Sequence, residues 1–143
     1  MTESERMIKR ILVAVDGSQQ SLNAVRLASE IAQSTHAEMT LLAVVEVADV
    51  PELMMTDQIN GKGVAMDSLL EEAAELAVSH GLEAKTALRH GHPADQILRF
   101  AKEQKIDMIV TGSRGRGDAK GIIMGSVSRA ITKRAEIPVL IVR

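Results

Sequence analysis

Five short runs of apolar residues, four of them almost continuous, constrain the fold of this chain more than any other feature. They cover residues 11–15, 39–45, 84–88, 108–111 and 139–142. A strand loses the usual alternation of apolar and polar residues when both of its faces are buried, as in a parallel sheet that helices cover on both sides. The runs therefore predict a parallel sheet in the interior of the molecule.

The segments between these strands have the spacing of amphipathic helices. The first helix is predicted to follow Ser18, a favoured N-cap residue, and the second to end at Gly81, which suits the left-handed position after a helix. The third begins with Pro93 and the last stops before Pro138. Alternating strands and helices imply right-handed crossovers. We therefore expect one α/β domain over residues 1–143, an open parallel sheet with helices on both faces.

The composition supports this class and excludes several functions. Hydrophobic residues make up 45% of the 143 residues, but there is one Phe and no Trp or Tyr, so the core must be aliphatic. The absence of Cys excludes a disulfide framework, a thiolate metal site and a catalytic cysteine. A net charge of −2 gives no general attraction to nucleic acid or acidic membranes, and no apolar run reaches transmembrane length. We expect a cytoplasmic protein with neither a nucleic acid nor a membrane as its partner.

Residues 47–63 show no regular pattern and contain Pro51, Asn60, Gly61 and Gly63. We expect an irregular connection there, which is long for a compact domain. Two interpretations remain open, a mobile flap beside a binding site and a plain surface loop.

A glycine-rich segment follows the fourth strand and leads into the last helix. Gly112, Gly115 and Gly125 allow the backbone to approach a ligand closely and to turn its N–H groups inward. Ser126 adds a hydroxyl at the start of a helix, where free N–H groups and the helix dipole suit a phosphate, and Arg114 adds positive charge. The segment is neither a P-loop nor a standard dinucleotide fingerprint, because its glycine spacing fits neither. A structural turn with Ser126 as an N-cap is the alternative.

The spacing Gly112-x-x-Gly115, nine residues, then Gly125-Ser126 resembles the nucleotide motif of the universal stress protein family. Residues 11–18, 91–98 and 138–142 also resemble family segments, so the resemblance covers essentially the whole chain. It implies a Rossmann-like, adenine nucleotide alpha hydrolase-like sheet of five strands in the order 3-2-1-4-5, in a homodimer. Members with the complete motif bind ATP, and this sequence has the motif complete.

Asp16 follows the first strand, at the edge of the sheet where open parallel sheets bind ligands. Its carboxylate either caps the next helix through an Asx turn or hydrogen-bonds the adenine or ribose of a nucleotide. The resemblance implies the second role. It also implies base contacts along Ala14, Val15 and Val44, ribose contacts at Thr111 and Gly112, and phosphate-binding N–H groups at Gly115, Gly125, Ser126 and Val127. Ser113 and Arg114 complete the expected site.

The expected cofactor is ATP or another adenine nucleotide, with Mg²⁺ or Mn²⁺ carried on the phosphates rather than by protein ligands. His90 and His92 are only two candidate ligands, and an exposed turn before Pro93 explains them better. The apolar fifth strand (Val139, Leu140, Ile141, Val142) would be an edge strand that pairs with a second copy. We expect a binding protein with a regulatory or stress-response role. A weak ATPase or adenylate-handling enzyme and a nucleotide-free dimeric scaffold are the alternatives.

Overall fold

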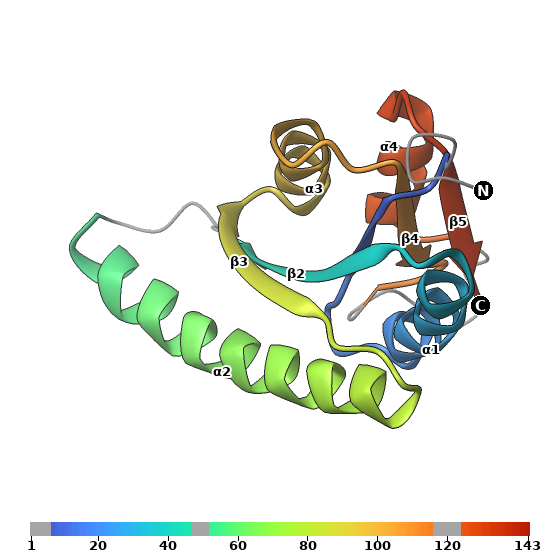
Figure 1. Ribbon diagram of the computed structural model, residues 1–143. Helices are drawn as coiled ribbons and strands as arrows, with labels where there is room; N and C mark the ends of the chain where they lie inside the picture. Colours follow the sequence, from blue (N-terminus) through green and yellow to red (C-terminus); the bar gives the residue numbers. More distant parts are fainter. Residues whose placement is uncertain (1–6, 47–51, 116–123) are drawn as a thin grey trace.

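The computed structural model describes residues 7–46, 52–115 and 124–143, and within 52–64 it describes the backbone alone. Strands and helices alternate strictly along the chain (Figure 1). The strands are β1 (Arg10–Ala14), β2 (Glu38–Glu46), β3 (Lys85–Gly91), β4 (Met108–Gly112) and β5 (Val139–Val142). The helices are α1 (Gln19–Thr35), α2 (Glu52–Ser79), α3 (Pro93–Glu103) and α4 (Ser126–Arg134).

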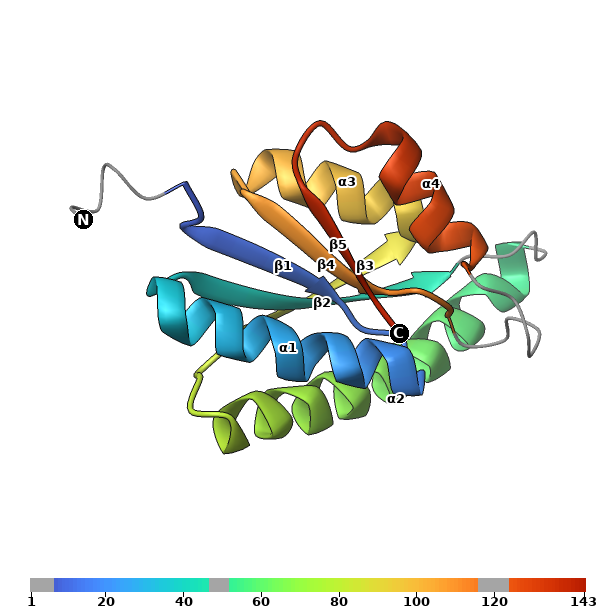
Figure 2. The ribbon, with the colours of Figure 1, turned by 90° about the vertical axis from the view of Figure 1, so that its right-hand side faces the viewer.

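The five strands form one parallel sheet in the order β3-β2-β1-β4-β5, so the predicted fold class and strand order are confirmed. Helices α1 and α2 cover one face of the sheet, and α3 and α4 cover the other (Figure 2). Successive residues of β1 pack into two different cores. Ile11 and Val13 lie in the cluster toward α1 and α2, whereas Leu12 lies in the cluster toward α3 and α4. Burial on both faces is the reason why the central strands lack polar alternation.

Local sequence sets where the helices begin. The Ser18 hydroxyl accepts a hydrogen bond from the Ser21 N–H at 3.1 Å and caps α1. Asp16 Oδ1 accepts the Ser18 N–H at 2.9 Å, which is an Asx turn, and Gly17 supplies the left-handed φ of +86° that the turn needs. Pro93 occupies the first turn of α3, where its missing N–H costs nothing.

The expectation of an irregular connection over residues 47–63 is wrong for residues 52–63, which belong to α2. Residues 47–51 lie outside the described part of the chain. Gly61 and Gly63 each cost about 1 kcal/mol in a helix relative to Ala, which lowers helix propensity without forbidding a helix. Good helix formers such as Met54, Met55 and Gln58 precede them, and the helix continues into a packed segment.

The strand ends differ slightly from the apolar runs. The largest difference is in β3, which continues through Arg89 and His90 to Gly91. This strand lies at one edge of the sheet and is partly exposed, so its second half contains polar residues and a search for apolar runs stops at Leu88.

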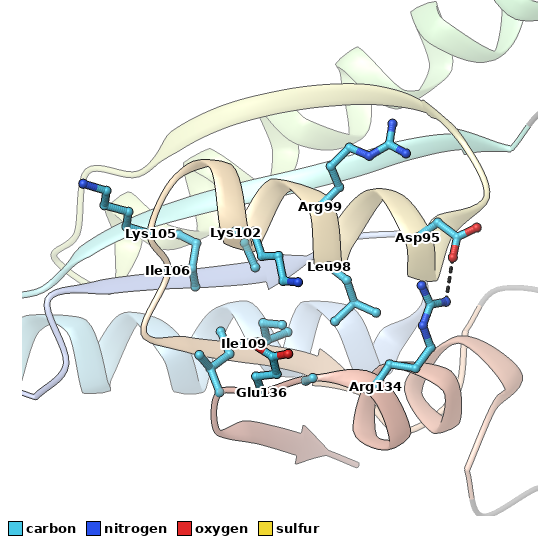
Figure 3. A pocket seen from close by; sticks show the side chains of 12 residues that line it. Asp95, Leu98, Arg99, Lys102, Lys105, Ile106, Ile109, Arg134 and Glu136 are labelled. Carbon is cyan, nitrogen blue, oxygen red and sulfur yellow. Dashed lines mark hydrogen bonds and ion pairs between the residues drawn. The ribbon is translucent and has the colours of Figure 1, made fainter.

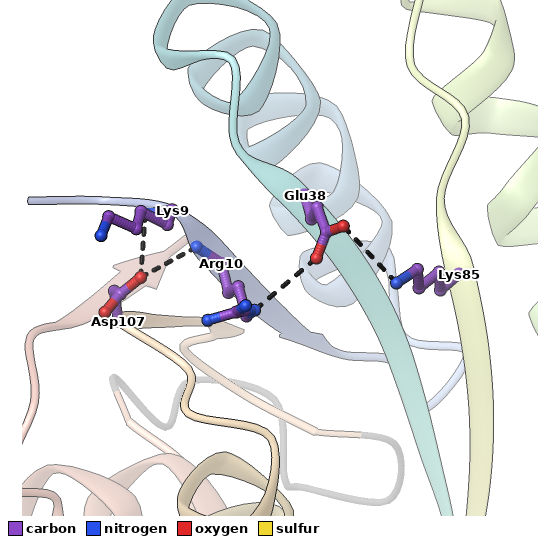
Figure 4. Close-up of polar contacts among 5 residues, drawn as sticks. All are labelled: Lys9, Arg10, Glu38, Lys85 and Asp107. Carbon is purple, nitrogen blue, oxygen red and sulfur yellow. Dashed lines mark hydrogen bonds and ion pairs between the residues drawn. The ribbon is translucent and has the colours of Figure 1, made fainter. Parts of the chain in front are cut away.

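The amino-terminal edge of the sheet is held by carboxylates (Figure 4). Asp107 Oδ2 accepts the backbone N–H groups of Lys9 and Arg10 at 2.8 and 2.9 Å, which joins the start of β1 to the residue before β4. The Glu38 carboxylate lies between Arg10 Nε and Lys85 Nζ, each at 3.6 Å from one of its oxygens. These ion pairs are exposed and contribute little to the stability of the fold.

We predict that Asp107→Ala lowers the free energy of unfolding by about 1–2 kcal/mol, because two backbone donors lose a charged acceptor. The midpoint of thermal unfolding should fall by roughly 3–6 °C. Asp107→Asn keeps one carbonyl oxygen and should recover most of the loss. Equal losses in the two variants would contradict the assigned role of Oδ2.

Helices α3 and α4 are joined by an exposed ion pair, with Arg134 Nη1 2.6 Å from Asp95 Oδ1. This hydrogen bond from Arg134 is the main reason why the pKa of Asp95 lies below its ordinary value of 3.8. The positive charges of Arg134, His92 and Arg99 lower the pKa further, and burial opposes the shift with a smaller effect than that of the hydrogen bond. A carboxyl group whose pKa is lowered by folding stabilises the fold at pH values above its ordinary pKa. This contribution is lost as the pH falls through the lowered pKa.

Arg134→Gln should therefore return the pKa of Asp95 to its ordinary range, measured by NMR titration of the carboxyl carbon. The difference in thermal midpoint between the two proteins should be present at neutral pH and disappear in acid. Lys133→Gln is the control, because Lys133 is a neighbouring exposed cation that makes no ion pair in the described structure.

Candidate functional site

A cleft of about 430 Å³ lies at the carboxyl ends of the central strands. Its walls come from the ends of β1, β2 and β4, from the start of α4, and from residues of α2 and α3. Strands β1 and β4 are neighbours, but the chain leaves them toward opposite sides of the sheet, and the crevice between them is where open parallel sheets bind ligands. Its volume is within the range of small-molecule sites.

The structure brings nearly all of the predicted site residues together in this cleft. Its lining includes Ala14, Val15, Asp16, Val44, Thr111, Gly112, Arg114, Gly115, Ser126 and Val127. Two expected residues, Ser113 and Gly125, do not line it. They are hydrogen-bonded to each other, because the Gly125 N–H donates to the Ser113 carbonyl at 2.6 Å.

One end of the cleft is the amino terminus of α4. Gly125 is the N-cap, no side chain of the described residues caps the helix, and the first intrahelical bond is from the Arg129 N–H to the Gly125 carbonyl at 3.0 Å. The N–H groups of Ser126, Val127 and Ser128 therefore precede the helical hydrogen-bond ladder. These three N–H groups and the helix dipole make this end of the cleft suitable for an anion.

Gly125, which is expected to donate its N–H to a phosphate, makes other contacts in this structure. Its N–H is already satisfied by Ser113, and its carbonyl accepts the Ser128 hydroxyl at 3.1 Å. The Ser128 hydroxyl also reaches the Ser113 carbonyl at 2.9 Å. Gly125 and Ser113 thus fix the start of α4 against the end of β4.

Two carboxylates also line the cleft. Asp16 follows β1 and Glu46 ends β2, and both line the cleft. The Asx turn shows that the capping role of Asp16 is real, and Oδ1 of the carboxylate forms it. The lining of the cleft therefore combines two carboxylates with a helix amino terminus and the side chain of Arg114.

Apolar side chains form much of the rest of the lining. Val44 and Leu42 come from β2, Ile97 from α3 and Met66 from α2, which is a surface suited to a flat, apolar ring. The sequence did not indicate Met66 or Ile97 as site residues. The rule that strand ends line the crevice could have indicated Glu46, whereas no sequence signal marked Met66.

The other candidates do not converge. His90 and His92 are both exposed, one at the end of β3 and the other before α3. No group of three or more His, Cys, Asp or Glu side chains able to hold a metal occurs among the described residues. In the same part of the chain, no helix is long and apolar enough to cross a membrane.

Comparison with known proteins agrees with this architecture. The model of the universal stress protein family matches residues 7–143. The chain belongs to that family. A universal stress protein of Bacillus subtilis, YxiE, is 36% identical over 148 residues and covers 96% of this chain and all of its own length.

Solved structures of the family have the same fold. The universal stress protein UspA of Lactobacillus plantarum superposes with a TM-score of 0.87 at 25% identity, over 94% of this chain and 97% of its own. A universal stress protein solved in complex with cAMP gives a TM-score of 0.73 at 27% identity, over 94% of this chain and 96% of its own.

Proposed function

We propose that this universal stress protein binds ATP, or another adenine nucleotide, in the cleft between β1 and β4. The observation that carries the proposal is that one cleft combines an anion-binding helix amino terminus, an apolar surface and two carboxylates. A nucleotide has groups that match all three, namely its phosphates, its base and its sugar. The N–H groups of Ser126 and Val127 and the Arg114 guanidinium would hold the phosphates.

The base would lie against Val44, Leu42 and Ile97, with Asp16 and Glu46 accepting hydrogen bonds from the adenine amino group or the ribose hydroxyls. The cAMP complex of a relative supports an adenine nucleotide as the class of ligand. ATP is preferred because the glycine spacing is complete in this sequence. Mg²⁺ or Mn²⁺ would be bound mainly through the phosphates and water.

Gentle purification followed by heat denaturation tests this proposal directly. The supernatant, separated by ion-exchange chromatography, should contain adenine nucleotide in amounts comparable with the protein. The protein freed of ligand should bind ATP in calorimetry and should bind GTP more weakly, because the guanine amino and carbonyl groups differ from those of adenine. The proposal would be refuted if no nucleotide were released and no ATP affinity could be measured.

A second part of the proposal is a homodimer through β5, acting in the cytoplasm as a regulatory module of the stress response. The strand lies at the free edge of the sheet, and Val139, Leu140, Ile141 and Val142 are all partly exposed. The opposite edge, β3, carries Lys85, Arg89 and His90 along its length, and charged residues of this kind discourage edge pairing. The apolar edge is therefore the better surface for a second copy.

The register of β5 provides a sharp test. The carbonyl oxygens of Pro138 and Val142 accept hydrogen bonds from the N–H groups of Ile109 and Ser113. The backbone groups of the even-numbered residues therefore point toward β4, and those of Ile141 point toward the free edge of the sheet. Ile141→Pro removes an outward N–H without breaking the bonds to β4. Light scattering should show a dimer for the unmodified protein and a monomer for the variant, with circular dichroism unchanged. An unmodified protein that stays monomeric at micromolar concentration would contradict the dimer.

A further inference from the structure

A second cavity, of about 670 Å³, lies between α3 and the segment that joins α4 to β5 (Figure 3). We refer to it as the α3–α4 groove. Ile109 of β4 and Ile106 form its floor, Leu98 of α3 forms one wall, and Ile137 contributes on the opposite side. None of its lining residues lines the nucleotide cleft, so the two cavities are separate.

The rim of the α3–α4 groove is positively charged on a chain whose net charge is −2. Its ionisable residues are Arg99, Lys102, Lys105 and Arg134 against Asp95 and Glu136. Asp95 is already paired with Arg134, which closes one end of the groove. The groove thus offers more positive charge than its own acids neutralise.

Lys102 is the cation best placed to meet a ligand. In Figure 3 its side chain extends from α3 across the cavity, whereas the Arg99 guanidinium extends away from it and Lys105 lies at the far end. Among the described residues the ammonium group of Lys102 makes no ion pair or hydrogen bond. An unpaired ammonium above an aliphatic floor is complementary to a molecule with an apolar chain and an anionic head.

The apolar surface that a ligand can contact in the groove is small, which favours a slender ligand over a protein segment. Ile109 is 0% exposed and Ile106 and Ala101 are each 5% exposed, so the accessible apolar lining comes mainly from the partly exposed side chains of Leu98 and Ile137. A single polymethylene chain can cover such a surface. We propose that the α3–α4 groove binds small amphiphilic anions, namely aliphatic carboxylates, with the carboxylate at Lys102 and the chain along the floor between Leu98 and Ile137.

Methyl NMR with decanoate as the probe, below its critical micelle concentration, tests the site. The methyl signals of Leu98, Ile106, Ile109 and Ile137 should shift, whereas those of Val44 and Val127 in the nucleotide cleft should not. The result should be the same with and without ATP, so the outcome does not depend on the proposed nucleotide function. Shifts confined to Val44 and Val127 would overturn the proposal.

Affinity measurements test whether binding depends on the apolar chain of the ligand and on its carboxylate. From hexanoate through octanoate to decanoate, each added methylene should tighten binding by about fourfold if it is buried. Lys102→Met should weaken decanoate binding by roughly tenfold or more, and Glu136→Gln, which removes a repelling charge from the opposite lip, should tighten it. Lys133→Met is the matched control, because it removes one cation from α4 outside the groove. Equal binding of decylamine, or equal losses in the Lys102 and Lys133 variants, would refute a built carboxylate site.

Discussion

Ser126→Pro should weaken ATP binding by roughly 10- to 100-fold while leaving the fold and the thermal midpoint unchanged, because a phosphate-binding N–H and a hydroxyl are lost from the start of α4. Proline is tolerated at the first position of a helix, where the N–H has no intrahelical partner. The residue before it must be extended, and Gly125 already has φ −76° and ψ 169°. The substitution thus removes an N–H and a hydroxyl from the cleft without disturbing the helix.

Ser126→Ala separates these two losses, since it removes the hydroxyl and keeps the N–H. We expect it to weaken binding much less than Ser126→Pro, by calorimetry under identical salt conditions. Circular dichroism must show intact helix content in both variants. If Ser126→Pro bound ATP as well as the unmodified protein, the phosphates would lie elsewhere, and the assignment of the α4 end would be wrong even if nucleotide were released on heating.

The apolar runs were enough to predict the sheet and its burial, because strands covered on both faces leave a strong pattern. The strand order required the resemblance as well. The predicted site residues at the strand ends meet in one cleft for a topological reason. Once β1 and β4 are neighbours, Asp16 and Thr111 must lie at the same edge of the sheet.

The contributions of the helices to the cleft could not be predicted in the same way. Met66 and Ile97 reach it through tertiary packing of α2 and α3, and their own sequence patterns indicate only helix faces toward the core. The glycines at 61 and 63 also concealed the length of α2. Two glycines lower the helix propensity of this segment without forbidding a helix, and the residues before them are good helix formers.

The glycine-rich segment could not be interpreted fully for another reason, because the sequence does not show which neighbouring atoms each glycine contacts. Gly125 was predicted to donate its N–H to a ligand, but the structure uses that N–H to hold Ser113. Gly112 was predicted to permit close approach of a ligand. The structure gives it a second and more stringent reason, which is the close approach of α1.

Gly112→Ala should be the most destabilising small substitution that we predict for this protein. A Cβ at position 112 would lie 2.8 Å from the Gln20 Cβ, 2.9 Å from the Gln20 backbone carbon and 3.0 Å from the Ser21 backbone nitrogen. Backbone atoms in the first turn of α1 cannot rotate away, so α1 must shift from β4. We expect a loss of about 3 kcal/mol in the free energy of unfolding, measured by urea denaturation, and a thermal midpoint lower by roughly 10 °C.

Two matched variants make the prediction specific to this contact. Gly61→Ala is the same substitution inside α2 and should stabilise the protein by up to about 1 kcal/mol, because Ala is the better helix former. Gln20→Ala, combined with Gly112→Ala, should not restore stability, since it leaves the Gln20 Cβ and both backbone contacts in place. Restored stability in the double variant would show that a flexible side chain, and not the backbone of α1, makes glycine necessary at position 112.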